Sequence, residues 1–281
     1  MRCQESAYTI PDYLDHEWQA RLLEDFDASS DDDDAYDDDM IQVNDTTQVT
    51  SFQGKINEVW REKICEWCYQ LVDHFDINRE VVNVAMNYLD RYLATCTVNR
   101  RMFQLAAMTA LYLAMKLYEP DTLRLPELVK LGHGYFHADH IEAMEVAMLQ
   151  ALTWRVRPPT PYSFCRELMQ LVSSDITPRA CHEIGEMARF LTELSVCNYY
   201  FVTRKPSSIA LASIINAFEL LGPNRVDPRY KVDFLHDLKE LYRIGGSAPD
   251  YDDDEIIECY ELLRETYISG GYTITLVLDG R

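Results

Sequence analysis

The sequence predicts an all-α protein in which a disordered, acidic N-terminal segment precedes two consecutive five-helix domains. Apolar residues recur at every third or fourth position through most of the chain, the spacing that places them on one face of a helix. These runs fall into two groups of five, and the stretch RVRPPTP (155–161) separates the groups because proline cannot continue a helix. We expect an N-terminal segment (1–50), a first domain (51–157), a second domain (158–268) and a tail (269–281).

The N-terminal segment is strongly acidic. Residues 1–45 carry 15 acidic side chains and 2 basic ones, a net charge of −13 within a total of −21. The run DDDDAYDDD (31–39) repels itself and has little apolar surface to bury, which favours disorder over residues 1–50. The run lacks the glycine and the alternating ligands of an EF-hand, so calcium binding is not expected. We expect this segment to contribute nothing to the folded core.

Charge and hydropathy also exclude several classes of partner. A strongly negative chain repels phosphate backbones, so direct binding to nucleic acid is not expected. The beginning of the chain, MRCQESAYTIPDYL, has no apolar stretch of the kind found in secretory leaders. No apolar run reaches the length that spans a bilayer. These observations predict a soluble intracellular protein without a membrane partner.

Five helices are predicted in the first domain. The third of them is apolar on nearly all sides from Phe103 to Leu117, which indicates a helix buried between its neighbours. The fourth is short and is closed by Gly132 and Gly134. The predicted helices cover residues 52–75, residues from about 78 through VAMNYLDRYLA (84–94), and residues 101–118, 125–131 and 137–153.

The pattern starts again after the linker and predicts five more helices. Pro206 and the pair Gly222-Pro223 are among the residues that separate them. The tail contains TITLV (273–277), which is too short to indicate a strand. The predicted helices cover residues 161–172, 178–202, 207–221, 229–243 and 252–268.

One acidic residue in the second predicted helix needs an explanation. Asp90 lies on the border of the apolar stripe of VAMNYLDRYLA, where an ionised carboxylate is costly unless it is paired. Arg61 lies on the corresponding border of the first helix, so the two side chains could form a bidentate pair that fixes the packing of these helices. Spacing alone leaves open whether they form this pair or are separate, solvated charges.

The sequence carries no sign of catalysis. It contains none of the motifs GxxxxGK[ST], GxGxxG, GxSxG and HExxH. The eight cysteines are scattered, and Cys65 and Cys68 form a lone CxxC without a second ligand pair at zinc-finger spacing. Both are expected to be small buried hydrophobic residues. We expect no catalytic residue, metal or cofactor, and interpret the chain as a helical interaction module.

Several stretches in chain order resemble the cyclin family, and most of all its D-type members, over about residues 50–225. VAMNYLDRYLA is similar to the family's NYLDR core, and WREKICEW (60–67) is similar to its MRxIxxxW helix. FQLAAMTALYLAMKLYE (103–119) resembles the LQLxxxxxxxLASKxxE helix. Further similar stretches are MEVAMLQALTW (144–154), PPTPYSF (158–164) and KPSSIALASI (205–214), the last of which resembles a D-type segment.

This resemblance implies a regulatory subunit that binds and activates a cyclin-dependent serine/threonine kinase in cell-cycle entry, within the nucleus and cytoplasm. Arg61 and Asp90 match the buried ion pair that orders the cyclin box. Lys116 and Glu145 match the charged pair that holds the activation-controlling helix of the kinase. The apolar positions that match the kinase contact are Leu113, Leu117, Trp154 and Val156.

The residues themselves also allow ordinary structural explanations. Lys116 ends an otherwise apolar helix, where a cation is favourable beside the negative C-terminus or can extend its amine to solvent. Glu145 could belong to a solvated helix face. Leu113 and Val156 could pack in the core.

Two further binding features are implied by the resemblance. One is a groove that docks substrates with a basic-x-leucine motif, although Lys63 replaces an apolar residue and would repel a basic ligand. The other is MRCQE, in which Cys3 and Glu5 match the LxCxE motif that binds retinoblastoma-type pocket proteins. Kinase inhibitors are a further implied partner. The positions that match the docking groove are Trp60, Ile64, Trp67, Gln70, Phe103 and Gln104.

Two other classes of function remain for a helical chain of this kind. A cyclin-fold scaffold or transcription-related adaptor without kinase activation would be expected to carry a basic face or a zinc ribbon, and this sequence shows neither. A helical enzyme would need the motifs that are absent.

Overall fold

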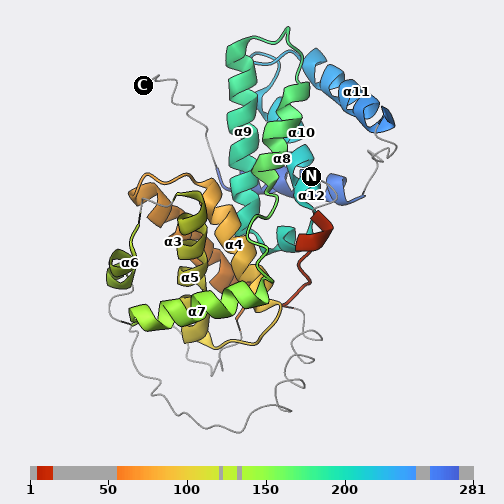
Figure 1. Cartoon of the computed structure of the whole chain (residues 1–281). Coiled ribbons are helices and arrows are strands. Elements are labelled where there is room, and N and C mark those ends of the chain that lie inside the picture. Colours follow the sequence, from red (N-terminus) through yellow and green to blue (C-terminus); the bar gives the residue numbers. More distant parts are fainter. Residues whose placement is uncertain (1–4, 15–55, 120–122, 132–134, 245–253, 272–281) are drawn as a thin grey trace.

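The computed structural model describes residues 5–14, 56–119, 123–131, 135–244 and 254–271. Within these ranges the chain forms ten α-helices, three short 3₁₀ helices and no strand, arranged as two helical domains (Figure 1). The all-α prediction with five helices in each domain is therefore confirmed. None of the described helices combines the length and the apolar character needed to cross a bilayer.

The N-terminal domain is built around α5. Asparagine side chains start two of its helices: Asn57 accepts a hydrogen bond from the backbone N–H of Trp60, and Asn99 accepts one from Met102. α5 packs against both α4 and α7 and buries residues around most of its circumference, as its continuous apolar sequence predicts. The helices are α3 (Glu58–His74), α4 (Glu80–Leu93), α5 (Arg100–Tyr118), α6 (Leu125–Leu131) and α7 (Ala138–Ala151).

The C-terminal domain is built around α10, which packs against its neighbours α8, α9 and α12. Three of its helices begin with proline in the first turn, where the missing N–H needs no partner. Thr160 and Thr177 cap two of them by accepting backbone N–H bonds. The helices are α8 (Pro161–Leu168), α9 (Pro178–Cys197), α10 (Pro206–Leu221), α11 (Arg229–Ile244) and α12 (Asp254–Ser269).

The helix predicted over 178–202 is interrupted. α9 ends at Cys197, and Asn198 adopts extended backbone with φ −88° and ψ 122°. The Asn198 side chain accepts a hydrogen bond from the N–H of Tyr200 and so starts a 3₁₀ turn, η3 (Tyr199–Thr203). Periodicity could not indicate this break, since the apolar residues continue through it. The α8 prediction also ran too far, because the chain tightens into η2 (Met169–Leu171).

The prediction that residues 1–50 contribute nothing to the core is wrong for residues 5–14. This strap, which includes η1 (Ser6–Tyr8), lies between the two domains (Figure 1). Ile10 and Tyr13 are buried in the N-terminal core, and the Tyr13 ring meets the Tyr199 ring edge-on at 5.3 Å. The sequence did not predict that these two apolar residues are buried, because the first 45 residues are strongly acidic overall. Three features predicted from the sequence lie outside the described residues: the acidic run 31–39, the glycines 132 and 134, and TITLV (273–277).

We expect Tyr13→Phe to lower the free energy of unfolding by about 1.5–3 kcal/mol, because it removes a buried hydrogen bond that the Tyr13 hydroxyl donates to the charged Asp90 carboxylate at 2.7 Å. Chemical denaturation monitored by circular dichroism measures the change. Tyr118→Phe, at an exposed tyrosine of α5, is the matched control and should be neutral. Equal stability of the Tyr13→Phe protein and the wild type would mean that the strap is only loosely attached.

Candidate functional site

Arg61 and Asp90 form a buried bidentate ion pair between α3 and α4. The Arg61 Nε and Nη2 atoms each donate to one Asp90 carboxylate oxygen at 2.8 Å, and both residues are 3% exposed. Burial by itself lowers the pKa of Arg61, but the charge of Asp90 and its hydrogen bonds raise this pKa above its ordinary value. Of the two explanations that the sequence allowed, the structure shows the buried pair.

The same pair also joins the two domains. The remaining Arg61 nitrogen, Nη1, donates to the backbone carbonyl of Val196 at 2.8 Å, near the end of α9. Asp90 in turn accepts the hydrogen bond from Tyr13 of the strap. Burial and the negative charge of Asp90 hold the pKa of Tyr13 well above its ordinary value, so the phenol stays protonated. Arg61 is therefore bonded to α4 and α9, and Asp90 to α3 and the strap.

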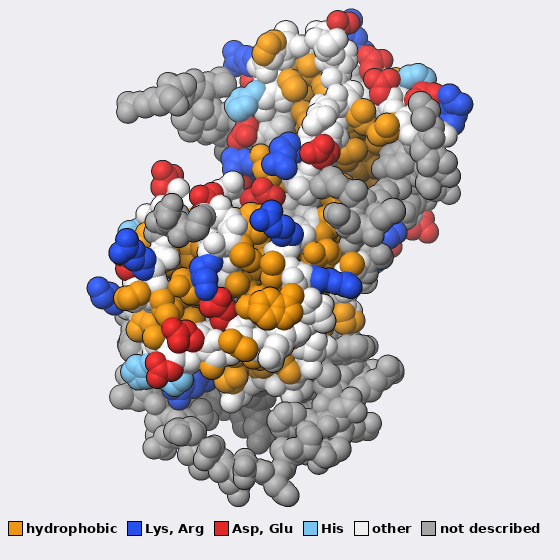
Figure 2. All heavy atoms as spheres, viewed as in Figure 1, with side chains coloured by type: hydrophobic (Ala, Val, Ile, Leu, Met, Phe, Trp, Pro, Cys, Tyr) orange, Lys and Arg blue, Asp and Glu red, His pale blue; other side chains and the backbone are white. Residues whose placement is uncertain are grey.

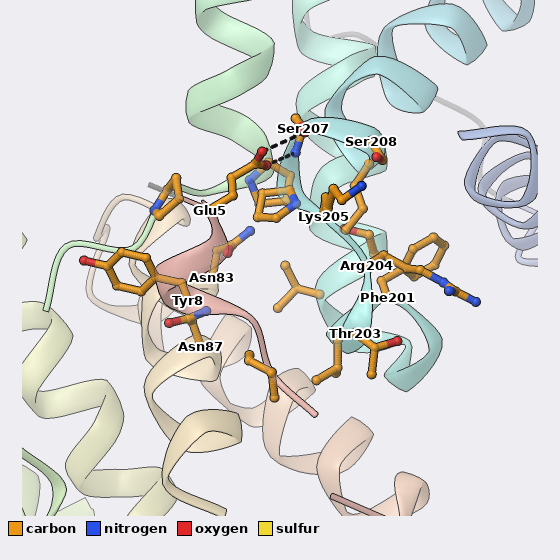
Figure 3. Close-up of a pocket in the computed structure, with 18 of the residues that line it drawn as sticks. Glu5, Tyr8, Asn83, Asn87, Phe201, Thr203, Arg204, Lys205, Ser207 and Ser208 are labelled. Atoms are coloured by element: carbon orange, nitrogen blue, oxygen red, sulfur yellow. Dashed lines mark hydrogen bonds between the residues drawn. The ribbon is translucent and has the colours of Figure 1, made fainter. Parts of the chain in front are cut away.

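The strap is held at its other end by the C-terminal domain. The Glu5 carboxylate accepts hydrogen bonds from the backbone N–H and the hydroxyl of Ser207, at 2.7 and 3.0 Å, at the N-terminus of α10 (Figure 3). An anion is favourable there because the first N–H groups of a helix have no partner within the helix. Beside this contact lies a cavity of about 470 Å³, with Tyr8, Asn83 and Lys205 among its lining residues. Glu5 is thus buried rather than presented as part of a linear motif, and Cys3 lies outside the described residues.

Lys116 and Glu145 meet on the surface of the N-terminal domain. Lys116 lies in the last turn of α5 and Glu145 lies on α7, and Lys116 Nζ is 2.6 Å from Glu145 Oε1. The Lys116 amine also lies 5.2 Å from the centre of the Tyr112 ring. The Lys116 side chain is 42% exposed, so this pair borders solvent and is accessible to a partner. The position of Lys116 at the end of α5 also agrees with the other explanation, in which its charge is favourable beside the negative C-terminus of the helix.

Large apolar side chains are exposed around this pair. Figure 2 shows hydrophobic atoms gathered on the face of the N-terminal domain where α7 crosses in front of α5. Trp154 is the most exposed, at 68%. Leu113 is instead buried in the core, and Val156 is half-buried and accepts a hydrogen bond from the Tyr88 hydroxyl through its backbone carbonyl. We call these exposed residues, together with the half-buried Glu145, the α5–α7 surface: Lys116, Leu117, Tyr118, Glu145, Val146 and Trp154.

The backbone that presents Trp154 has an unusual conformation. Thr153 and Trp154 both have positive φ, 51° and 60°, which is unfavourable for side chains with a Cβ and persists only where neighbouring contacts impose it. Arg91 of α4 supplies such contacts by donating to the carbonyl of Leu152 at 2.9 Å and to that of Arg155 at 2.8 Å. No sequence signal indicated Arg91 as the residue that clamps this turn.

The positions predicted for substrate docking do not form one exposed groove. Trp60, Ile64, Trp67 and Gln104 are half-buried and Gln70 is exposed. Phe103 is completely buried, so it cannot contact a ligand; its place in the all-round apolar helix explains this. The guanidinium of Arg100 lies 4.5 Å from the centre of the Trp60 ring and covers it, and Lys63 is exposed beside them. Two cations thus border this patch.

Comparison with known proteins matches each half of the chain to a domain of one protein family. The family described as "Cyclin, N-terminal domain" matches residues 34–157, and "Cyclin, C-terminal domain" matches residues 159–273. The structure is similar to a viral cyclin from herpesvirus saimiri, with a TM-score of 0.61 and 16% identity over 78% of this chain and 88% of that one. It is also similar to a chain of the CAK complex of Chaetomium thermophilum, with a TM-score of 0.53 and 17% identity over 75% of this chain and 63% of that one.

Curated relatives include mitotic cyclins of plants. G2/mitotic-specific cyclin-1 of Antirrhinum majus is 31% identical over 211 residues, which cover 75% of this chain and 40% of the relative. Cyclin-A1-4 of Oryza sativa subsp. japonica is 27% identical over 183 residues, 63% of this chain and 50% of the relative. The chain thus spans half or less of these relatives. Their names are those of mitotic and A-type cyclins, so the predicted similarity to D-type cyclins is not supported. With both cyclin domains matched in order, the chain belongs to the cyclin family.

Proposed function

We propose that this protein is a regulatory subunit that binds and activates a cyclin-dependent serine/threonine kinase through the α5–α7 surface, without catalysing a reaction itself. The observation that supports the proposal is the Lys116–Glu145 pair between α5 and α7, which also carry exposed Leu117 and Val146, with exposed Trp154 shortly after α7. Stable interfaces combine an apolar centre with a few charges that fix register. Two structures similar to this chain come from the CAK complex and from the yeast RNA Pol II CTD kinase complex, and the second of these is named as a kinase assembly.

The proposed mechanism is activation by a preformed surface. The kinase becomes active when its mobile helix moves inward and completes the Lys–Glu pair and the magnesium site of its catalytic centre. A surface can displace that helix only if it resists deformation itself. Two features supply this resistance. Arg91 donates hydrogen bonds to the backbone on both sides of Thr153 and Trp154, and α5 packs between α4 and α7. In this proposal the partner's acidic and basic groups engage Lys116 and Glu145 at the edge of the apolar contact.

The relatives also bear on when such a kinase would act. The likeness to D-type cyclins predicted a role in cell-cycle entry, whereas the relatives named above are a mitotic cyclin and an A-type cyclin. We therefore favour a mitotic kinase over one of cell-cycle entry. Binding to a retinoblastoma-type protein through MRCQE is disfavoured, since Glu5 is bonded to Ser207.

We expect Lys116→Ala combined with Glu145→Ala to weaken kinase association at least tenfold, about 1.4 kcal/mol, with unchanged circular dichroism. The measurement is copurification of the kinase with the tagged protein, followed by a kinase assay. Arg243→Ala with Glu240→Ala is the control, because it removes an ion pair of the same type from the exposed face of α11. If the variant with Lys116→Ala and Glu145→Ala associates with the kinase as well as the wild type does, this pair does not contribute to kinase binding. Copurification without any stimulation of the kinase would instead support the scaffold or adaptor alternative.

A further inference from the structure

Two cysteine sulfur atoms meet where the domains join. Cys65 lies on α3 and Cys197 is the last residue of α9, 132 positions later in the chain, yet their Sγ atoms are 3.3 Å apart. Both are free thiols. A disulfide has an S–S length of about 2.05 Å, so the two sulfurs need to approach by roughly 1.3 Å to form one. A change of χ1 in two side chains supplies a movement of this size.

The two thiols differ in access and acidity. Cys65 is completely buried, and this burial raises its pKa well above the ordinary value. Cys197 is half-buried at the end of its helix, and its hydrogen bond with Cys65 lowers its pKa against the opposing effect of burial. Arg61 adds positive charge beside Cys197 and donates a hydrogen bond to its carbonyl at 3.4 Å. Of two thiols, the less buried one with the lower pKa reacts first with an oxidant, because its thiolate is the nucleophile.

We propose that Cys65 and Cys197 form a redox-sensitive site, at which a peroxide converts the two thiols into a disulfide that ties α3 to α9. The Cys197 thiolate attacks one oxygen of hydrogen peroxide, becomes a sulfenic acid, and the displaced hydroxide leaves as water after protonation. The Cys65 sulfur then attacks the sulfenic sulfur and displaces its hydroxyl, which takes the Cys65 proton and leaves as a second water. Two thiols lose two electrons in total, and one peroxide is reduced to two waters.

The position of the pair gives the disulfide a structural effect. Cys65 lies one helical turn after Arg61 on α3, and Cys197 follows Val196, whose carbonyl accepts the Arg61 hydrogen bond. The disulfide would therefore add a covalent link between α3 and α9, which the Arg61 hydrogen bond already connects. A cross-link across 132 positions restricts the unfolded chain over a long loop, which raises stability. This inference does not rest on kinase binding.

The test uses the full-length protein treated with hydrogen peroxide, with dithiothreitol treatment as the reference. Free thiols are blocked with N-ethylmaleimide, and the protein is digested with trypsin without reduction and examined by mass spectrometry. We expect a linked species of the peptides 64–79 and 190–204, and a rise in melting temperature of roughly 4–8 °C that dithiothreitol reverses.

Matched variants assign the bond. Because residues 64–79 contain both Cys65 and Cys68, the linked species should persist in Cys68→Ala and disappear in Cys65→Ala and Cys197→Ser. In Cys65→Ala the sulfenic acid on Cys197 should be trapped by dimedone, which reports the first step even if this variant is less stable. Cys181→Ser, at another half-buried cysteine of α9, should behave as the wild type. Absence of the linked species in oxidised wild-type protein, or its loss in Cys68→Ala, would overturn the proposal.

Discussion

Arg61→Ala should destabilise the folded protein by about 3–5 kcal/mol, because it leaves the Asp90 carboxylate buried without its cation. The variant also removes the donor of the Val196 carbonyl, so the loss falls on the contact between the domains as well as on the packing of α3 against α4. Denaturant unfolding at several wavelengths measures the change. The expected result is a transition at much lower denaturant concentration.

Two further variants separate burial from charge. Arg79 joins the domains through a comparable bond to Glu193 at 2.7 Å, but it is partly exposed, so Arg79→Ala should cost no more than about 1 kcal/mol. Replacing the whole network by Arg61→Met, Asp90→Leu and Tyr13→Phe removes every charge and the donor hydroxyl together, and should be much milder than Arg61→Ala. If Arg61→Ala and Arg79→Ala prove equally mild, Arg61 and Asp90 are solvated in solution and the buried pair is wrong.

Trp154→Ala should weaken kinase association by about 2–4 kcal/mol, since exposed aromatic side chains at the centre of an interface often supply most of its binding energy. The side chain is 68% exposed, so its removal should change the free energy of unfolding by less than about 0.5 kcal/mol. Alanine keeps the strain of the positive φ, so the turn itself is not altered.

Titration of the kinase against immobilised protein provides the affinity of each variant. Val232→Ala is the control, because Val232 has a similar exposed fraction, 66%, on α11 of the other domain. We expect it to bind as the wild type does. Full affinity in Trp154→Ala would place the kinase on another surface, while equal losses in both variants would indicate a non-specific effect of removing apolar area.

The helices could be predicted from the sequence because the signals that define them are local. Each signal lies within a few residues of the helix that it determines. Examples are the caps Asn57 and Thr160, the prolines at helix starts, and the spacing of apolar residues. The Arg61–Asp90 pair could be predicted in part, since a charge at the border of an apolar stripe requires a partner. The likeness to cyclins supplied the rest of that prediction.

The contacts that escaped prediction join residues far apart in the chain. Tyr13 meets Asp90 across 77 positions, and Arg61 meets Val196 across 135, so no local spacing marks either pair. The left-handed turn at Thr153 and Trp154 carries neither glycine nor asparagine, which usually signal that conformation. Phe103 was assigned to a surface by family likeness, although its own helix is apolar on all sides and buries it.

The bond between Glu5 and Ser207 has a consequence for the order in which the protein assembles during synthesis. The two residues are 202 positions apart, and ribosomes add roughly 5–20 residues per second, so Glu5 waits about 10–40 s for its partner. Tyr199, which accepts the N–H of Leu14, also emerges long after the N-terminal helices. Residues of the strap therefore reach their final positions long after they leave the ribosome. During that interval Arg61 lacks its partner on α9, and a nascent chain stalled before residue 196 should be a better substrate for chaperones than the finished protein.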